Sequence, residues 1–162
     1  MKNDISAIGN ALVDTVFKVE QSLISELGLE IDQMTLSSAE EHAPIIDRLI
    51  ASGAETVLDC GGSATNSLVA AASFGAKCFH TCKVSDDQDG LRYLESLKDA
   101  GVGHKGNMAP ARNVPTGKCL ILVTPDAKRT MTTALNVSSL MNDDDLDLNQ
   151  IANSKIFYIE GY

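Results

Sequence analysis

The sequence predicts an α/β fold, and two observations predict it: the composition and the order of the central segments. The chain has 162 residues, of which 44% are hydrophobic, so it can bury a core and the natural count is one domain. Aromatic residues make up only 4%, which favours aliphatic packing of helices on a sheet over a small β-barrel. Between residues 56 and 84, a strand, a glycine loop, an alanine-rich helix and a second strand follow one another. This order predicts a parallel sheet with a right-handed crossover.

The charge and the cysteines restrict the partners and the environment. A net charge of −9 and a pI near 4.6 argue against nucleic acid or an anionic membrane as the main partner. No apolar run is long enough to span a bilayer, and the polar first residues are not typical of a signal peptide. The four cysteines lack paired spacing, so we expect reduced thiols in a cytoplasmic protein and no metal ligands among them.

The first strand leads to an acidic side chain. Residues 5–8 form a short apolar strand, which Gly9 and Asn10 interrupt, and Asp14 follows among apolar neighbours. In open α/β sheets, ligands bind outside the carboxyl ends of the strands. Asp14 is therefore a candidate acceptor of hydrogen bonds from substrate hydroxyls. The alternative is that Asp14 only caps the next turn.

The glycine loop is the second candidate ligand contact. The strand of residues 56–60 leads into Gly61 and Gly62, and a helix follows. Because these glycines have no Cβ, the backbone can adopt positive φ angles and a ligand can approach it closely. The first-turn N–H groups suit hydroxyl or phosphate groups, and polar side chains there offer N-cap oxygens: Ser63, Thr65 and Asn66. The alternative is an ordinary tight turn and helix cap.

Two further helices are predicted by caps and apolar spacing. Ser38 begins a capping box, so a helix should run over residues 39–52, with His42 in solvent. An acidic cap precedes a helix over residues 90–100. Their expected inward-facing residues are Ile45, Ile46, Leu49 and Ile50 in the first helix and Leu91, Leu94 and Leu97 in the second.

The C-terminal third predicts strands. Residues 119–123 and 128–133 are separated by a turn sequence, which predicts a β-hairpin. Residues 155–159 predict a final buried strand, after which the chain ends. Because a domain that stops at the end of a central strand cannot complete its sheet, we expect this chain to be a fragment.

Four segments occur in an order and at separations that resemble a known family. They are Ile-Gly-Asn-Ala-Leu-Val-Asp at 8–14, Gly-Gly-Ser-Ala-Thr-Asn at 61–66, Lys-Val-Ser-Asp-Asp-Gln-Asp-Gly at 83–90 and Tyr-Ile-Glu-Gly-Tyr at 158–162. Together they resemble the N-terminal half of the PfkB (ribokinase-like) carbohydrate and nucleoside kinases, closest to the adenosine kinase-like branch. The resemblance implies a three-layer α/β/α fold with a parallel-rich central sheet and a small β-sheet lid. The lid segments would be about residues 17–36 and 103–133.

The resemblance also implies an activity and a set of contacts. Members of this family transfer the γ-phosphoryl group of ATP, with magnesium, to a hydroxymethyl group of a sugar or nucleoside. The positions that match substrate contacts are Asn10, Asp14, Gly61, Gly62, Asn66 and Glu160. Arg129 matches a cation near the transferred phosphate, and the alternative is an exposed hairpin charge.

The family's catalytic signature, Asp-Thr-x-Gly-Ala-Gly-Asp, has no match in this chain. That signature supplies the general base and an anion hole, and the nucleotide and magnesium segments belong to the same half of the family fold. We therefore expect no catalytic residue in this chain, no activity of the chain alone and exposed apolar surface. The alternative is a non-catalytic sugar- or nucleoside-binding module or a regulatory pseudokinase. A dinucleotide-dependent oxidoreductase is disfavoured because no Gly-x-Gly-x-x-Gly follows a strand. A homodimer through the lid sheet is a further expectation.

Overall fold

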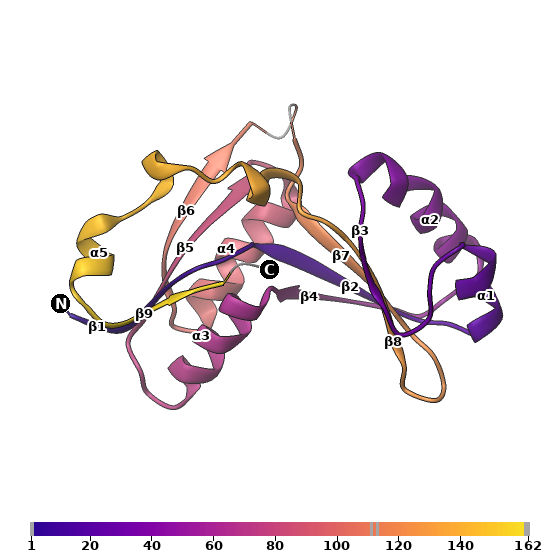
Figure 1. Ribbon diagram of the computed structural model, residues 1–162, viewed down its shortest axis with the longest axis horizontal. Helices are drawn as coiled ribbons and strands as arrows, with labels where there is room; N and C mark the ends of the chain where they lie inside the picture. Colours follow the sequence, from indigo (N-terminus) through magenta and orange to yellow (C-terminus); the bar gives the residue numbers. More distant parts are fainter. Residues whose placement is uncertain (1, 111, 113, 161–162) are drawn as a thin grey trace.

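A computed structural model describes residues 2–110, 112 and 114–160, which form two β-sheets (Figure 1). The four-stranded sheet is entirely parallel. Its strand order is β6 (Gly103–Ala109), β5 (Cys78–Ser85), β1 (Asn3–Ile8) and β9 (Ser154–Ile159). This parallel sheet confirms the predicted α/β class.

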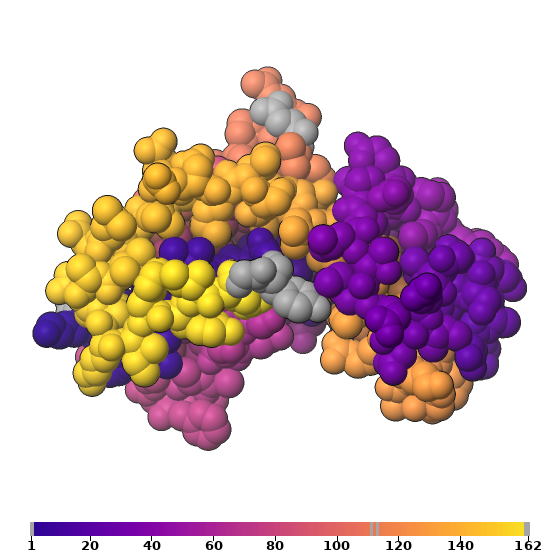
Figure 2. All heavy atoms as spheres, in the orientation of Figure 1, coloured from indigo at the N-terminus to yellow at the C-terminus, as the bar shows by residue number. Residues whose placement is uncertain are grey.

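The five-stranded sheet is mixed. Its order is β3 (Met34–Leu36), β8 (Arg129–Ala134), β7 (Gly117–Val123), β2 (Leu12–Lys18) and β4 (Thr56–Gly61). Strands β7 and β8 are antiparallel neighbours, which confirms the predicted hairpin. Strand β2 lies antiparallel to β4 and parallel to β7. Figure 2 shows the two parts as lobes, with the surface indented between α3 and the β7–β8 hairpin.

Helices α3 (Ser63–Ser73) and α4 (Gln88–Asp99) pack on one face of the parallel sheet. Side chains alternate along β5, so Cys82 joins the buried core with Tyr93 of α4, whereas Lys83 points the other way. On that second face, the Nζ atom of Lys83 lies 2.7 Å from Asp145 in η2 (Asp143–Asp145), which follows η1 (Asn136–Leu140). Helix α5 (Leu148–Ala152) then leads into β9. The sheet therefore has a layer on each face.

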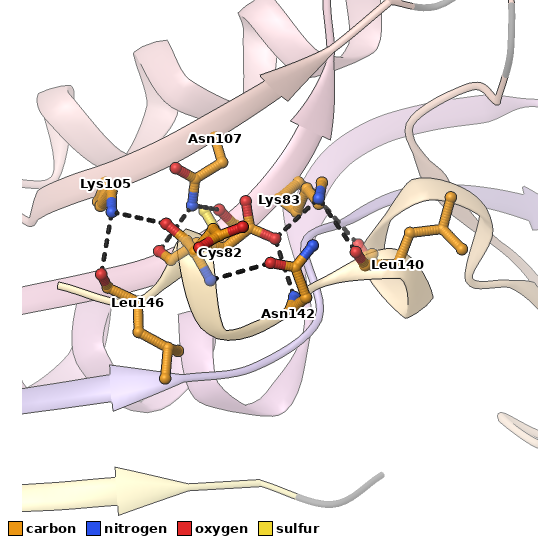
Figure 3. A network of polar contacts seen from close by, with 10 residues as sticks. Cys82, Lys83, Lys105, Asn107, Leu140, Asn142 and Leu146 are labelled. Atoms are coloured by element: carbon orange, nitrogen blue, oxygen red, sulfur yellow. Dashed lines mark hydrogen bonds and ion pairs between the residues drawn. The ribbon is translucent and has the colours of Figure 1, made fainter. Parts of the chain in front are cut away.

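The second layer is held by polar contacts rather than by an apolar helix face. Figure 3 shows Lys83 donating to the carbonyl of Leu140 and Lys105 donating to that of Leu146, each at 3.0 Å. Asn107 donates to the carbonyl of Asp145 at 2.9 Å. These donors come from neighbouring parallel strands, so the segment 140–146 is tied to both.

A separate core lies behind the five-stranded sheet. Helices α1 (Gln21–Glu26) and α2 (Ala39–Ala51) cover one face, and their buried residues include Leu23, Ile24 and Leu49. Leu120 and Leu122 of β7 point into this core, so the alternate residues of β7 face the opposite side. The capping box is confirmed: Ser38 Oγ accepts from Glu41 N, and the Glu41 carboxylate accepts from Ser38 N.

The predicted buried faces of α2 and α4 are each wrong at one end. His42 is buried and bonds to Thr132 Oγ1, whereas Ile50 is 66% exposed, so the buried face of α2 begins at His42. In α4, Tyr93 and Leu97 are buried and Leu91 is 57% exposed. In both helices the buried face follows i, i+3, i+7 positions. It starts one turn before the first expected residue in α2, at His42, and one residue before it in α4, at Gly90.

The assignment of strands to sheets differs from the prediction in three places. Strand β4 joins the five-stranded sheet, so α3 connects the two sheets, and the parallel strand–helix–strand unit is β5–α4–β6 instead. The expected lid segment 103–133 is wrong over β6, which belongs to the parallel sheet. The final strand β9 is not buried, because it lies at a sheet edge in the described part of the chain; Ile159 is 63% exposed. No helix among the described residues is long and apolar enough to cross a membrane.

Candidate functional site

A cavity of about 460 Å³ lies where residues of the two lobes meet. It is lined by Asn10, Leu12, Asp14, Met34, Leu36, Gly62, Ser63, Asn66, Cys119, Ile121, Arg129, Met131, Thr133, Leu135 and Glu160. The set includes every site residue that the sequence predicts except Gly61 and Thr65. Segments far apart in the chain therefore converge on one space.

The five-stranded sheet turns one face toward this cavity. Alternate residues of β8 line it, namely Arg129, Met131 and Thr133, and so do Cys119 and Ile121 of β7. Period-two alternation places such residues on one face of a strand. The same spacing from Arg129 in the sequence indicates Met131 and Thr133 as further residues of this face, although neither belongs to a motif.

Most of this face is apolar. Leu12, Met34 and Leu36 join the residues of β7 and β8 along the wall. Thr133 Oγ1 donates to the Cys119 Sγ atom at 3.3 Å, and burial raises the pKa of the Cys119 thiol. The thiol is therefore a neutral part of the wall at neutral pH.

The N-terminus of α3 supplies backbone donors. Gly62 is the N-cap residue, with a φ angle of +102°, and a Cβ there would lie 2.3 Å from the carbonyl oxygen of Asn10. Gly62 has no side chain to cap the first turn, so the expected N-cap role of polar side chains is wrong. Ser63 and Asn66 instead line the cavity. The first-turn N–H groups thus remain suited to hydroxyl or anionic groups of a ligand.

Thr65, the remaining polar residue of this turn, points away from the cavity into the core. Its Oγ1 atom hydrogen-bonds to the hydroxyl of Tyr93 and lies 3.4 Å from Nε2 of His80. Burial lowers the pKa of His80 to about 4 and raises that of Tyr93. Both groups are therefore neutral at physiological pH, and they hold the first turn of α3 against β5 and α4.

Asp14 is the third residue of β2 and not, as expected, a strand-end residue. Burial raises its pKa to about 6, the negative charge of Asp59 adds to the shift, and the positive charge of Arg129 opposes it. Asp59 is the partner of Asp14 across the β2–β4 pair. A Cβ at Gly61 would lie 2.2 Å from Asp14 Oδ2, so the missing side chain of Gly61 makes room for the carboxylate. Gly61 therefore contributes to the site indirectly, by leaving the space that the Asp14 carboxylate occupies.

Glu160 brings a second carboxylate to the cavity. Its Oε2 atom is buried and has no hydrogen-bond partner among the described residues. A buried carboxylate oxygen without a donor is unfavourable, and a ligand hydroxyl in the cavity would satisfy it. A Cβ at Gly9 would lie 2.5 Å from the Cβ of Ala64, so Gly9 lets α3 approach this end of the cavity.

The polar side chains that line the cavity suit a ligand with several hydroxyl groups. Two carboxylates and the side chain of Asn66 can bind hydroxyls, and Arg129 can bind an anionic group. Within the described ranges, no cluster of three or more His, Cys, Asp or Glu side chains could hold a metal ion. The residues that line the cavity thus suit a ligand that carries several hydroxyl groups and one anionic group.

Comparison with known proteins agrees with this geometry. The family described as "pfkB family carbohydrate kinase" matches residues 29–162. The chain belongs to the PfkB family. The ribokinase of Mus musculus is 30% identical to this PfkB chain over 94 residues, which cover 58% of this chain and 29% of the mouse protein. The resemblance drawn from the four sequence segments is thus confirmed.

Solved structures extend the comparison to the whole chain. The adenosine kinase from Sinorhizobium meliloti is 31% identical to this chain, with a TM-score of 0.91. The match covers 100% of this chain and 48% of the kinase chain. A probable sugar kinase from Rhizobium etli CFN 42 is 27% identical with the same TM-score of 0.91 and the same coverage. The ribokinase-like fold is therefore confirmed, and this PfkB chain spans about half the length of these two proteins.

Proposed function

We propose that the protein containing this chain transfers a phosphoryl group from ATP to a hydroxyl group of a sugar or nucleoside. In this proposal the chain supplies the binding site of the acceptor. The observation that carries it is the convergence of Asp14, Asn66 and Glu160 on one cavity, where Glu160 Oε2 has no hydrogen-bond partner within the described part of the chain. Membership of the PfkB family supplies the reaction class.

Asp14 and Glu160 accept hydrogen bonds from acceptor hydroxyls, and Asn66 both donates and accepts. Gly62 and Ser63 present the first-turn N–H groups of α3 to the same ligand. Arg129 neutralises negative charge on the transferred group. Magnesium-bound ATP supplies the phosphoryl group, and the residues that bind it and the general base lie outside this chain.

The apolar wall favours a nucleoside over a bare sugar. Polar contacts come mainly from the α3 side and from Asp14, whereas the opposite sheet presents Leu12, Ile121 and Met131 to the ligand. Ligand sites of this kind bury an apolar group against the wall and fix its orientation with a few polar contacts. A nucleobase suits the wall, and its ribose suits the polar groups. The similarity to an adenosine kinase agrees with this choice.

The five-stranded sheet acts as the lid over the acceptor in this proposal, since it supplies most of the wall. A homodimer through this sheet is part of the proposal as well. Its edge strand β4 exposes Val57 and Leu58, and an exposed strand edge can pair with a second copy. The cysteines carry free thiols, which agrees with a cytoplasmic location.

The test is a coupled assay of ATP consumption by the complete natural protein against a panel of nucleosides and sugars. We expect turnover with a nucleoside and a loss of about 10- to 100-fold in kcat/KM for Asp14→Asn, because a neutral amide replaces the charged acceptor and one acceptor oxygen becomes a donor. Glu55→Gln, at an exposed ion pair with Lys18 outside the cavity, serves as the control and should retain full activity. Binding of an acceptor without ATP consumption would instead support a non-catalytic binding module.

A further inference from the structure

Three segments that connect the two sheets meet at Gly117, the first residue of β7. A Cβ at Gly117 would lie 2.6 Å from the carbonyl oxygen of Ala11 and 2.9 Å from that of Leu135. Ala11 belongs to the connection from β1 to β2, and Leu135 follows β8. Asn10, Leu12 and Leu135 line the cavity. The position of this junction therefore sets the position of cavity residues in both lobes.

One carboxylate ties the junction to the parallel sheet and its helix. Asp87 caps α4, with Oδ1 accepting from Gly90 N at 2.8 Å. The same carboxylate accepts from Thr116 N at 2.8 Å and from Thr116 Oγ1 at 2.6 Å. Thr116 is only 2% exposed, directly precedes Gly117, and its Oγ1 atom accepts from Ser85 N at 3.0 Å. Asp87 thus links α4, the end of β5 and the start of β7.

The neighbouring charges support the same link. Lys118 of β7 lies 2.8 Å from the Asp89 carboxylate of α4, and both side chains are largely shielded from solvent. Burial opposes the ionisation of Asp87, but hydrogen bonds from Thr116 and Gly90 together with the charge of Lys118 outweigh it and lower the pKa of Asp87. Charged acceptors form stronger hydrogen bonds than neutral ones, so this contact is stronger than an ordinary helix cap.

We propose that Asp87 is a positioning residue, which fixes the five-stranded sheet relative to the parallel sheet and so holds the cavity in its binding-competent shape. This inference rests on the proposed function. Without the contact to Thr116, the lobes sample other orientations and only a fraction of molecules can bind the acceptor. The apparent affinity for the acceptor then falls in proportion to the fraction of molecules that can bind. A saturating concentration of acceptor returns all molecules to the binding-competent form. KM should rise while kcat stays the same.

The experiment uses Asp87→Asn in the complete natural protein. Asn caps helices as well as Asp does, and its remaining oxygen can still accept from Gly90 N and Thr116 Oγ1. Its amide NH₂ group takes the place of Oδ2 and cannot accept from Thr116 N, so that bond is lost. We expect the KM for the acceptor to rise about five- to tenfold, with kcat changed by less than about twofold. Thr116→Val should act in the same direction, and Thr116→Ser, which keeps the hydroxyl, should behave as the unaltered protein.

Asp147→Asn is the matched control. Asp147 caps α5 by accepting from Gln150 N, and α5 leads into β9, away from the junction at Gly117. This substitution makes the same chemical change at a helix cap. It should leave both KM and kcat unchanged.

Hydrogen exchange of the Thr116 amide gives a readout that does not depend on activity. In Asp87→Asn we expect this amide to exchange about tenfold faster or more, while the amides within α4 keep their protection. If the unaltered protein phosphorylates no sugar or nucleoside, the proposed function fails, and the exchange rates still test the contact. A KM equal to that of Asp147→Asn, or a loss confined to kcat, overturns the positioning role whatever the exchange shows. Should Asp87→Asn not fold, Thr116→Val and Thr116→Ser decide between the same outcomes.

Discussion

Asp14 meets two opposite requirements at one carboxylate. Its pKa in the fold, about 6, lies above the ordinary value of 3.8, chiefly because burial disfavours the charged form. The stabilisation that protonated Asp14 gives to the fold is therefore complete below about pH 4 and is lost as the pH rises through about 6. Proposed binding of acceptor hydroxyls requires the ionised form instead. The fold and the ligand thus favour opposite protonation states.

The pH dependence of acceptor binding follows from this conflict. We expect KM for the acceptor to rise as the pH falls below about 6, by up to about tenfold per pH unit, because protonated Asp14 loses acceptor capacity. Steady-state kinetics between about pH 5 and about pH 8 measure this. In Asp14→Asn the KM is high throughout and this dependence is absent. A KM that stays constant through the range in the unaltered protein contradicts the assignment.

The buried contact between Tyr93 and Thr65 makes a prediction about stability. Tyr93→Phe removes the hydroxyl that bonds to Thr65 Oγ1 and leaves the buried Thr65 with the longer contact to His80. We expect the free energy of unfolding to fall by about 1–2 kcal/mol, measured by urea denaturation.

Thr81→Val is the control for that measurement. Thr81 Oγ1 is also buried, but it has no hydrogen-bond partner among the described residues. Removing an unsatisfied hydroxyl should be neutral or stabilising. Equal losses of stability in the two variants would mean that the hydrogen bond between Tyr93 and Thr65 contributes nothing beyond a buried hydroxyl without a partner.

At the scale of elements, local signals predicted helices and the hairpin well. The capping box at Ser38 and the glycine before Ser63 predicted the starts of α2 and α3, because caps depend on a few adjacent residues. The residues of the buried faces were harder to predict. His42 is buried by tertiary contacts with β8, which the polarity of the first turn of α2 does not indicate.

The membership of strands in sheets could not be read from local order. Strand β4 precedes a glycine loop and a helix, as a strand of a parallel unit would, yet it pairs antiparallel with β2. Strand pairing depends on partners that are distant in sequence. The pattern of side chains within β4 is the same for a strand of either sheet, so it does not identify the partner. For the candidate site, the family segments identified the polar residues, whereas the apolar wall on β7 and β8 carries no motif and was missed.

At the scale of the whole molecule, β9 leaves apolar side chains in solvent. Ile156 is 58% exposed, and Phe157 and Ile159 are exposed beside it. We expect the 162-residue chain, expressed alone, to bind the hydrophobic dye ANS strongly and to transfer no phosphoryl group, because contiguous exposed apolar residues bind such dyes. Fluorescence titration measures the binding.

Two comparisons test the source of that dye binding. Ile159→Thr in the same chain should weaken the fluorescence, since Phe157 and Ile159 share one exposed face of β9. The complete natural protein should bind little dye. Strong and equal binding by all three proteins would show that the dye binds elsewhere.

The alternation of the two sheets along the chain has a consequence for synthesis on the ribosome. Every strand of the five-stranded sheet is present once Ala134 has been made, whereas β1 receives its partner β9 only when residues 154–159 follow. Asn3 and Ser154 are paired across almost the whole chain, and such distant contacts form slowly. The emerging chain therefore holds every strand of the five-stranded sheet first, and in the parallel sheet β1 can pair with β5 well before it pairs with β9.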